Sequence, residues 1–577
     1  MKSLSVTFVE LPATSDGKLY GKLSDDVYSL VRLPSRAIDL LAATAIAAGY
    51  ADTTAINPAF NRVRGYFTLE QLKRIITSDV VGISTITRTA RQSYELADYI
   101  KRINPASIIV MGGPHASALP EDALAHADVA VTKEGECTLV DLLGHIANGD
   151  EFSDIAGIVF KNKGGGIIRT PKRPFLTNEE LSALPFSTYS KEVLDGITHM
   201  VINTSRGCPY ACEYCAVIEN FGGQFRFLDI ERTIEAIQHA LSQTRKPIFF
   251  GDDNFAAAPN RTKTLLEEIL RRGIKMPPWL AQVRVESAND EDLLKTMKRS
   301  GCARVCIGFE SINEDTLKLF NKRSTPEKNS LAIERFHKAG ISIHGMFIIG
   351  ADTDSKETIK ETVKYAKEKR IDTAQFTLMV PLPGTKMTEK LEADKRVISH
   401  DWHLYDGHHI LVQPKIMPAN ELHEAAAMAW LDFYSFKEAV KHLFYGNEHW
   451  YNCLVRIWGK KLAQKSFEEK SYYHRALAGL DDWRNKIYGE YDSWMAKIDI
   501  IATDIKSDIE ERQNTARLEL ERLIKTIAEK RIRVDGFFAP YKQKILKEFE
   551  DAIYKKITEM DFLGSHRYLV PVQGIII

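Results

Sequence analysis

Two runs of alternating strand-like and helix-like segments occupy most of the first 400 residues of this chain. In the first run, short apolar stretches alternate with helical patterns such as those at 37–48 and 90–103. Such alternation is typical of an α/β fold with a parallel sheet, and continuously apolar strands are expected where helices cover both sheet faces. The sequence therefore predicts a doubly wound, Rossmann-like sheet over residues 1–150. Its strands are expected at Leu4–Leu11, Thr54–Asn57, Val80–Thr87, Ile108–Gly112 and Val129–Thr132.

The alternation resumes at about residue 198 and continues to about residue 400. Six strand–helix units fit a partial or full (β/α) barrel, and a second open sheet is the alternative. We predict a (β/α)6-type partial barrel over residues 196–399. Its strands are expected at Met200–Thr204, Pro247–Gly251, Trp279–Val283, Val305–Gly308, Gly345–Ile349 and Thr373–Leu378.

The remaining segments interrupt or follow these two runs. Residues 151–195 contain a hairpin pattern and several prolines, which indicates a linker between domains. After a tail at 400–449, which reads as helical over 420–445, comes a mostly helical C-terminal extension at 450–577. Apolar residues recur three or four apart over 487–527, which predicts one long amphipathic helix or an antiparallel coiled hairpin. We expect this element to serve packing or self-association.

Net charge and the pattern of apolar stretches give no sign of a nucleic-acid-binding, secreted or membrane-spanning protein. The 577 residues carry a formal net charge of zero, so nothing in the charge balance favours nucleic acid as a partner. The N-terminus lacks the pattern of a signal peptide. The longest apolar stretch, at 40–51, is too short to span a bilayer. We expect a cytoplasmic protein, with peripheral membrane contact left open.

Three of the seven cysteines lie within eight residues of one another, at Cys208, Cys212 and Cys215. Thiolates are the usual ligands of iron–sulfur clusters, and three of them would leave one iron of a [4Fe–4S] cluster open to another ligand. The alternative, a zinc site, requires a fourth ligand, and only His199 lies nearby. The spacing C-x3-C-x2-C therefore favours an iron–sulfur cluster. We interpret the other four cysteines as buried or incidental: Cys137, Cys302, Cys306 and Cys453.

This loop follows an apolar strand and has the aromatic Tyr214 just before its last cysteine, so it resembles the signature of the radical S-adenosylmethionine (SAM) superfamily. The resemblance implies that the open iron chelates SAM through its amino and carboxylate groups. An electron from an external one-electron reductant then cleaves SAM to methionine and a 5′-deoxyadenosyl radical.

Later segments resemble the remaining strand ends of that family. The acidic end of PIFFGDDNF (247–255) would hold the SAM amino group, although one of its two aspartates is expected to cap a turn or helix. An arginine in WLAQVRVES (279–287) would pair with the SAM carboxylate, or form a salt bridge inside the barrel. VCIGFES (305–311) would touch ribose and HGMFIIGADTDS (344–355) adenine. The predicted SAM-binding residues are Tyr214, Asp252, Asp253, Gln282, Arg284, Glu310, Ser311 and Gly350.

The first domain resembles the cobalamin-binding domain that precedes many radical SAM barrels. The pieces GGPHAS and KEGE carry the resemblance, and small residues at strand ends would let a large flat ligand approach the backbone. The D-x-H-x-x-G motif that supplies a cobalt ligand elsewhere is absent, so His115 is expected to hydrogen-bond the corrin periphery instead. A scaffold that has lost its ligand is the alternative. The predicted cobalamin-binding residues are Ser84, Thr85, Gly112, Gly113, His115, Glu134 and Gly135.

The resemblance covers residues 1–445 and implies methyl transfer, in which a methyl group carried by cobalamin passes to an unactivated carbon of a small-molecule, lipid or peptide substrate. A radical SAM oxidative cyclase is the alternative enzyme, and a cobalamin- or SAM-sensing regulator is the alternative from another class. Four histidines in the tail suggest a metal site, but packing is favoured for them: His400, His403, His408 and His409.

Overall fold

The structure is a computed structural model that describes residues 3–19, 23, 31–162, 164–441, 449–506, 510–529, 532 and 534–559. The chain forms two compact units. The first comprises Met1–Arg396, Asp401–Ile416 and Ala425–Glu469, and the second comprises Val397–His400, Met417–Glu424 and Lys470–Ile577.

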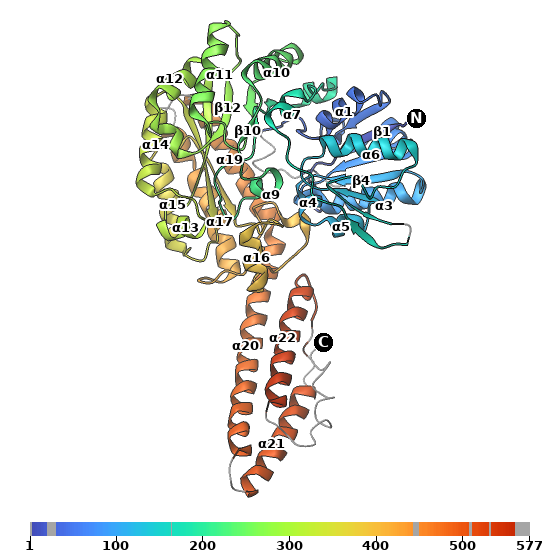
Figure 1. The fold of residues 1–577 in the computed structure, drawn as a ribbon. Helices are drawn as coiled ribbons and strands as arrows, with labels where there is room; N and C mark the ends of the chain where they lie inside the picture. Colours follow the sequence, from blue (N-terminus) through green and yellow to red (C-terminus); the bar gives the residue numbers. More distant parts are fainter. Residues whose placement is uncertain are drawn as a thin grey trace. The chain divides into compact units, whose positions relative to one another are not determined.

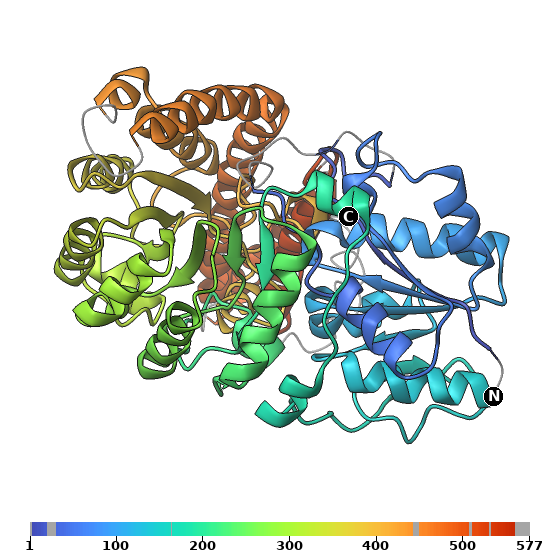
Figure 2. The same ribbon diagram turned by 90° about the horizontal axis from the view of Figure 1, so that it is seen from above.

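The first unit opens with a seven-stranded sheet of order β2-β1-β3-β4-β5-β6-β7, drawn in blue to cyan in Figures 1 and 2. Its first five strands are parallel, as predicted. The chain crosses from β1 to β2 on one side and returns to β3 on the other, so the switch point of the sheet lies at β1. The strands are β1 (Val6–Glu10), β2 (Thr53–Ile56), β3 (Val80–Ser84), β4 (Ile108–Gly112) and β5 (Val129–Val131).

Helices cover both faces of this sheet, because successive strand residues point to opposite sides. Phe8 and Val80 face α1 and α6, whereas their neighbours Val9 and Val81 face α2 to α5. This confirms the doubly wound fold. The helices are α1 (Ile38–Ala47), α2 (Leu69–Thr77), α3 (Ala90–Ile103), α4 (Pro114–Ala118), α5 (Pro120–Leu124) and α6 (Glu136–Asn148).

The hairpin that we assigned to the linker belongs to this sheet instead. Strand β6 (Ile158–Lys161) pairs antiparallel with β5, and β7 (Ile167–Arg169) pairs with β6. Ile158 and Phe160 are buried among the core residues beneath α1 and α6, which is why the hairpin is held against the sheet. The rest of 151–195 contains α7 (Asn178–Ala183) and α8 (Lys191–Gly196).

A six-stranded parallel sheet of order β15-β14-β13-β12-β11-β8 follows, in which each strand pairs with the next along the chain. Within the described residues β8 and β15 do not pair, so the barrel is partial, as predicted. Helices line its outer side in Figure 2. The strands are β8 (Met200–Ile202), β11 (Ile248–Phe250), β12 (Trp279–Val283), β13 (Cys302–Glu310), β14 (Ser342–Ile349) and β15 (Thr373–Leu378). The helices are α10 (Ile230–Gln243), α11 (Pro259–Arg271), α12 (Glu291–Arg299), α13 (Glu314–Leu319), α14 (Pro326–Lys338), α15 (Lys356–Glu368) and α16 (Lys386–Ala393).

The tail is helical, as predicted for the described part of 420–445; residues 442–448 lie outside the described residues. It contains α17 (Ala419–Phe433), α18 (Phe436–Lys441) and α19 (His449–Glu469). No helix in the described part of the chain combines the length and the apolar character needed to cross a membrane.

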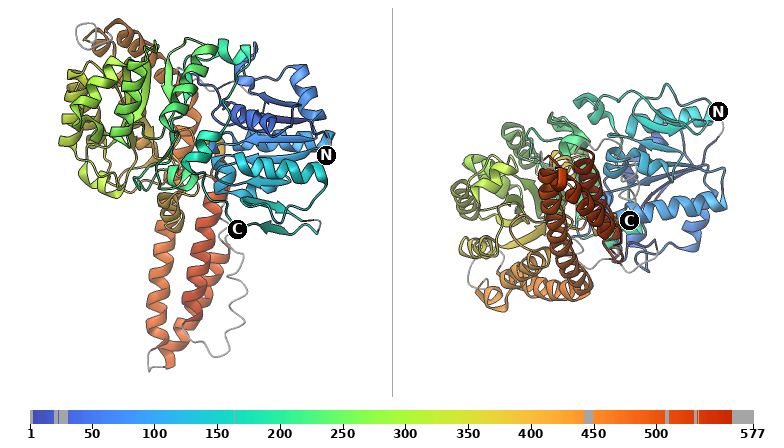
Figure 3. Two further views of the ribbon diagram at one scale, coloured as in Figure 1. Left: turned by 45° about the horizontal axis from the view of Figure 1, so that its top comes forward. Right: turned by 90° about the horizontal axis from the view of Figure 1, so that it is seen from below.

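Three long helices form most of the second unit and lie side by side in Figure 3. They are α20 (Ser471–Ile505), α21 (Glu510–Glu529) and α22 (Ala539–Thr558). The apolar repeat over 487–527 thus folds back as a helical hairpin, and its interior includes Trp494, Ile498, Leu520 and Ile524. Ile509 of that repeat, and residues 560–577 of the extension, lie outside the described residues.

Replacing Ile498 with alanine should destabilise this three-helix unit by about 2–5 kcal/mol, because Ile498 is 0% exposed and its loss leaves a cavity. Hydrogen exchange of peptides from α20 to α22 would measure this as faster exchange. Ile500→Ala on the same helix is the control, since Ile500 is 63% exposed and should change the unfolding free energy by less than about 0.5 kcal/mol. Equal effects of the two substitutions would contradict the assigned helix orientation.

Candidate active site

Two cavities lie where the strands of both sheets of the first unit end. The large cavity measures about 680 Å³ and is lined by the first domain, the cysteine loop and the segment after β15. The small cavity measures about 470 Å³ and lies at the ends of β1, β3 and β4. They share Ile86, Pro114, Lys133 and Asn220 as lining residues, so they adjoin one another.

The cysteine loop leaves the carboxyl end of β8 through a short two-stranded ribbon, β9 (Ser205–Arg206) with β10 (Arg226–Phe227). Cys208, Cys212 and Cys215 are all partly buried, and the Cys215 amide donates to the Cys212 carbonyl in a tight turn (3.2 Å). Gly207 has φ +83°, and a β-carbon there would collide with the Gln224 carbonyl. The loop starts with a conformation that only glycine tolerates.

The two aspartates after β11 have different surroundings. Asp252 is buried and accepts bonds from the backbone amides of Thr204 (2.7 Å) and Ser205 (2.5 Å) and from both their hydroxyls. Burial raises the pKa of Asp252 to about 6 in spite of these donors. Asp252 therefore fixes the turn from β8 into the cysteine loop. Asp253 lines the small cavity and receives a bond from the Gly207 amide, which leaves it as the carboxylate nearer the cysteines.

Tyr214 is anchored by a polar cluster that the sequence did not reveal. Its hydroxyl donates to Glu310 (2.8 Å), and the ammonium of Lys322 lies 2.9 Å from the same carboxylate oxygen. Both charged side chains are buried. Burial and the charge of Glu310 raise the pKa of Tyr214. Glu310 has φ +63°, and a side chain at Gly308 would strike its carboxylate, so this strand end is shaped around the cluster.

Arg284 lies directly over the cysteine loop. Its guanidinium stacks on the Tyr210 ring at 3.8 Å and lies 3.8 Å from the Cys212 sulfur. It also pairs with Glu286 (3.1 Å) and donates to the Lys322 carbonyl (2.7 Å). The arginine thus forms a salt bridge and contributes positive charge beside the thiols.

The other predicted SAM residues occupy less direct positions. Gln282 is exposed and lines neither cavity, although it lies on β12, the strand that ends just before Arg284. Ser311 is buried and accepts a bond from the Asn313 amide (3.0 Å). Gly350 has φ +100° and its amide donates to Asp354 (2.7 Å). In this structure Ser311 and Gly350 shape the strand ends.

Most of the predicted cobalamin residues line the small cavity: Ser84, Gly112, Gly113, Glu134 and Gly135. Thr85 does not line either cavity and is fully buried. Glycine at position 113 was expected to make room for a ligand, but the structure gives another reason for it. With φ +95°, a β-carbon there would lie 2.8 Å from the Thr85 carbonyl oxygen, so the chain's own backbone requires the glycine.

His115 contacts neither cavity, contrary to our expectation of a hydrogen bond to a corrin. Its ring is fully buried, with Nε2 2.9 Å from the Tyr94 hydroxyl and Nδ1 3.3 Å from the Thr87 hydroxyl. Trp402 packs edge-on against it at 5.0 Å. Burial lowers its pKa to about 4, so the ring is neutral near pH 7. His115 instead supports the loop that carries Thr87 into the large cavity.

A buried ionic network joins the first domain to the cysteine loop. Arg206, two residues before Cys208, donates to Glu134 (2.9 Å) and Glu136 (2.6 Å), which follow β5. Arg226 of the ribbon also pairs with Glu134 (2.8 Å). Burial alone would raise the pKa of Glu136, but the two arginines hold it below its usual value. We call this network the interdomain clamp.

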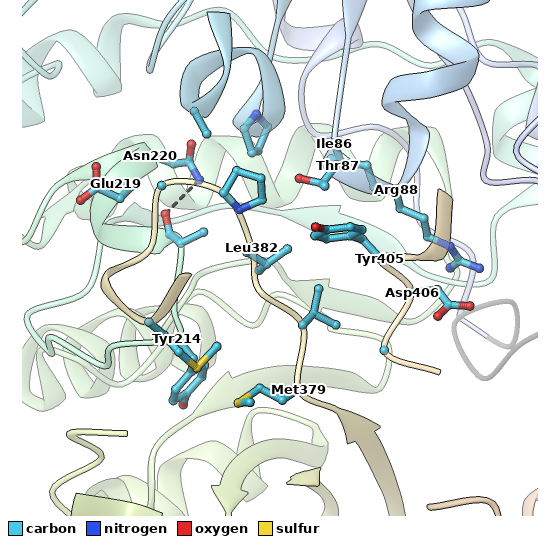
Figure 4. Close-up of a pocket in the computed structure, with 18 of the residues that line it drawn as sticks. Ile86, Thr87, Arg88, Tyr214, Glu219, Asn220, Met379, Leu382, Tyr405 and Asp406 are labelled. Carbon is cyan, nitrogen blue, oxygen red and sulfur yellow. Dashed lines mark hydrogen bonds between the residues drawn. The ribbon is translucent and has the colours of Figure 1, made fainter. Parts of the chain in front are cut away.

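The large cavity is mostly apolar on its barrel side. Figure 4 shows Tyr405 between Thr87 of the first domain and Leu382 of the loop after β15. Polar groups lie at its edges, including Arg88, Glu219 and Asp406. The apolar residues of this wall are Ile348, Leu378, Met379, Val380, Leu382, Pro383 and Met387.

The tail histidines do not converge on a common point in the described residues. His403 pairs with Asp401 (2.7 Å), and His409 pairs with Asp406 (2.9 Å). Neighbouring carboxylates thus orient these two rings, as expected for packing elements.

The residues present fit an iron–sulfur cluster, SAM and a cobalamin. The three thiols share one partly open loop, and burial raises the pKa of Cys208, and that of Cys215 to about 12, so iron binding would release their protons. Both cavities have volumes within the usual ligand range of about 300–1,000 Å³. The small one combines polar groups, such as Glu10 and Arg36, with an apolar slot at Phe8, Leu41, Val110, Val131 and Leu139.

Comparison with known families and proteins identifies this arrangement. Residues 202–366 match the family model of the radical SAM superfamily, and residues 30–143 match that of the B12 binding domain. An uncharacterized methyltransferase of Pyrococcus horikoshii is 32% identical over 380 residues, which are 64% of this chain and 82% of the relative. The bacteriochlorophyllide d C-12(1)-methyltransferase of Chlorobaculum tepidum is 29% identical over 350 residues, 60% of this chain and 72% of the relative.

A solved structure shows the same fold. The radical SAM methyltransferase TsrM from Kitasatospora setae, with cobalamin and a [4Fe–4S] cluster bound, aligns with a TM-score of 0.61 at 16% identity. The alignment covers 82% of this chain and all of that one. The family match and the 32% identical relative show that the protein is a radical SAM enzyme. It belongs to the branch of the radical SAM superfamily with a B12-binding domain, whose cofactors are a [4Fe–4S] cluster, SAM and cobalamin.

Substituting Glu134 with glutamine should lower the unfolding free energy of the first unit by about 3 kcal/mol, because Arg206 and Arg226 would keep buried charges without their shared carboxylate. A lower urea midpoint would measure it. Glu121→Gln is the control, since Glu121 pairs with Arg169 on the surface and should cost at most about 1 kcal/mol. Equal urea midpoints for Glu134→Gln and for the control would show that the interdomain clamp does not stabilise the first unit.

Protonation of the buried His115 ring should destabilise the first unit in acid. Its pKa is lowered from 6.5 to about 4, so its contribution is complete above pH 6.5 and is lost as the pH falls toward 4. The loss between pH 7 and pH 5 should be about 2 kcal/mol. In His115→Gln the melting temperature should therefore fall less between these pH values than in the wild type. An identical fall in both proteins would argue against a buried neutral ring.

Proposed function

We propose that this chain is a cobalamin-dependent radical SAM methyltransferase that methylates an unactivated carbon of a substrate bound in the large cavity. The observation that supports the proposal is that the two cavities adjoin: Tyr214 of the cysteine loop lines the large one, and strand ends of the B12-binding domain line the small one. When bound, the cluster and SAM supply a 5′-deoxyadenosyl radical, and cobalamin supplies the methyl group.

In this proposal Cys208, Cys212 and Cys215 would hold the cluster, and three thiolates would leave one iron open for SAM. Asp253 is the carboxylate placed to receive an ammonium group near the loop, and Arg284 is the cation placed to receive a carboxylate. Both are oriented by neighbours: Asp253 by the Gly207 amide and Arg284 by Glu286 and Tyr210.

Tyr214, Glu310 and Lys322 have a positioning role beside these groups. Their mutual bonds fix the last turn of the cysteine loop against the end of β13. The apolar wall of the large cavity would exclude water from a substrate radical, and so protect it from side reactions. Ser84, Gly112 and Gly113, at the ends of β3 and β4, line the small cavity and would hold the cobalamin.

The identity of the substrate, whether small molecule, lipid or peptide, is to be found by screening. An external one-electron reductant is part of the proposal, because SAM cleavage consumes one electron. Cytoplasmic location and self-association through the C-terminal helices stay predictions.

Anaerobic reconstitution with iron, sulfide and hydroxocobalamin should yield about four irons per chain and one cobalt. With SAM and a reductant, the loaded protein should form both 5′-deoxyadenosine and S-adenosylhomocysteine, since radical formation and methyl donation each consume one SAM. Cys212→Ala should abolish 5′-deoxyadenosine, and Cys453→Ala, a cysteine buried in α19, is the matched control.

Formation of 5′-deoxyadenosine without S-adenosylhomocysteine would count against methylation and favour oxidative cyclisation. With a substrate in hand, product mass separates the two: one added CH2 group indicates methylation and a loss of hydrogens indicates cyclisation. If the Cys212→Ala protein kept its cellular effect after losing SAM cleavage, that effect would be assigned to the regulator alternative rather than to catalysis.

A further inference from the structure

Helices α18 and α19 expose apolar side chains that the fold of the first unit does not use. On α18, Phe436 is 64% exposed and Val440 is 36% exposed. On α19, Leu454 is 46% exposed and Trp458 is 60% exposed. Residues four apart lie on one side of a helix, so each helix carries one exposed apolar pair. Because α18 and α19 pack against each other, we take the two pairs together as a candidate interaction surface.

The opposite sides of these helices hold them on the barrel. Glu438 and Ala439 of α18 are buried, and Arg456 of α19 is fully buried. The Arg456 guanidinium donates to the carbonyls of Phe433 (2.6 Å) and Ile371 (2.9 Å). These contacts hold the inner side of α19 against the first unit, while Trp458 on the same helix and Phe436 on α18 stay exposed.

Positive charge accompanies the exposed apolar pairs. Arg456 is buried and does not contribute to this charge, whereas Lys460 is partly exposed. Lys437 and Lys461 are exposed, and Lys441 is 48% exposed while it pairs with Glu438. Because Lys441 and Glu438 neutralise each other, Lys437 and Lys461 supply the exposed positive charge in the described part of the two helices.

We propose that this surface of α18 and α19, which we call the aromatic–lysine surface, docks on an anionic lipid bilayer. Exposed Trp and Phe side chains with flanking lysines are the side chains that membrane interfaces favour, since the rings enter the acyl boundary and the ammonium groups contact lipid phosphates. No helix of the described residues spans a membrane, so the contact is peripheral. This inference does not depend on the proposed methyl transfer.

The test is flotation of the full-length protein with vesicles of 70% phosphatidylcholine and 30% phosphatidylglycerol. The wild type should float with these vesicles at low salt and bind phosphatidylcholine vesicles more weakly. Phe436→Ser/Trp458→Ser should weaken binding at least about tenfold, because two aromatic side chains no longer enter the bilayer. Lys437→Ser/Lys461→Ser should weaken it about 30-fold and reduce its dependence on salt.

Val63→Ser/Leu69→Ser is the matched control, since these side chains are 64% and 71% exposed on the first domain. The control should bind as the wild type does. Trp458 fluorescence should shift to the blue on vesicle binding and be quenched by brominated lipid, a signal absent from Trp458→Phe.

Absence of wild-type flotation would overturn the proposal, as would full binding by both surface variants. Concentration-dependent dimers that Phe436→Ser/Trp458→Ser abolishes, without vesicle binding, would reassign the surface to a second copy of the chain. Iron and cobalt contents are measured on the same preparations, so a failure here is distinguishable from a failure of the proposed function.

Discussion

The buried ion pairs between Glu134, Glu136, Arg206 and Arg226 are the constraint on which the rest of the first unit depends. They tie the loop after β5 of one sheet to the ribbon that begins the cysteine loop of the other. Charges buried this way are costly unless each finds its partner, so the network tolerates only one relative placement of these loops. That placement also fixes the walls shared by the two cavities.

Burial determines much of the chemistry of the site. Low polarity raises the pKa of Cys215 and lowers that of His115, because burial penalises the charged form of each group. The same environment strengthens the bonds of Glu310 to Tyr214 and Lys322. An apolar wall on the barrel side and polar groups at the rim suit a reaction in which a reactive carbon must be kept from water.

The sequence predicted the parts of the fold that depend on local pattern. Strands β4, β12 and β15 have the predicted bounds, because turn residues on both sides of an apolar run fix where the strand can begin and end. The hairpin at β6 and β7 was misplaced, since its pairing partner β5 is distant in sequence. Gln282 and His115 line neither cavity, which the sequence could not indicate, because whether a polar side chain faces a cavity or the protein interior depends on neighbours from other elements.

By itself, the sequence determined the two domains, the cysteine spacing and the cofactor class, because these depend on residues close together in the chain. Only the tertiary structure decided which groups meet. It brought Lys322 to Glu310, gave Asp252 and Asp253 separate roles, and joined Arg206 to Glu134. These contacts link residues 12 to 72 positions apart, and their geometry arises from the packing of whole elements, which no local pattern encodes.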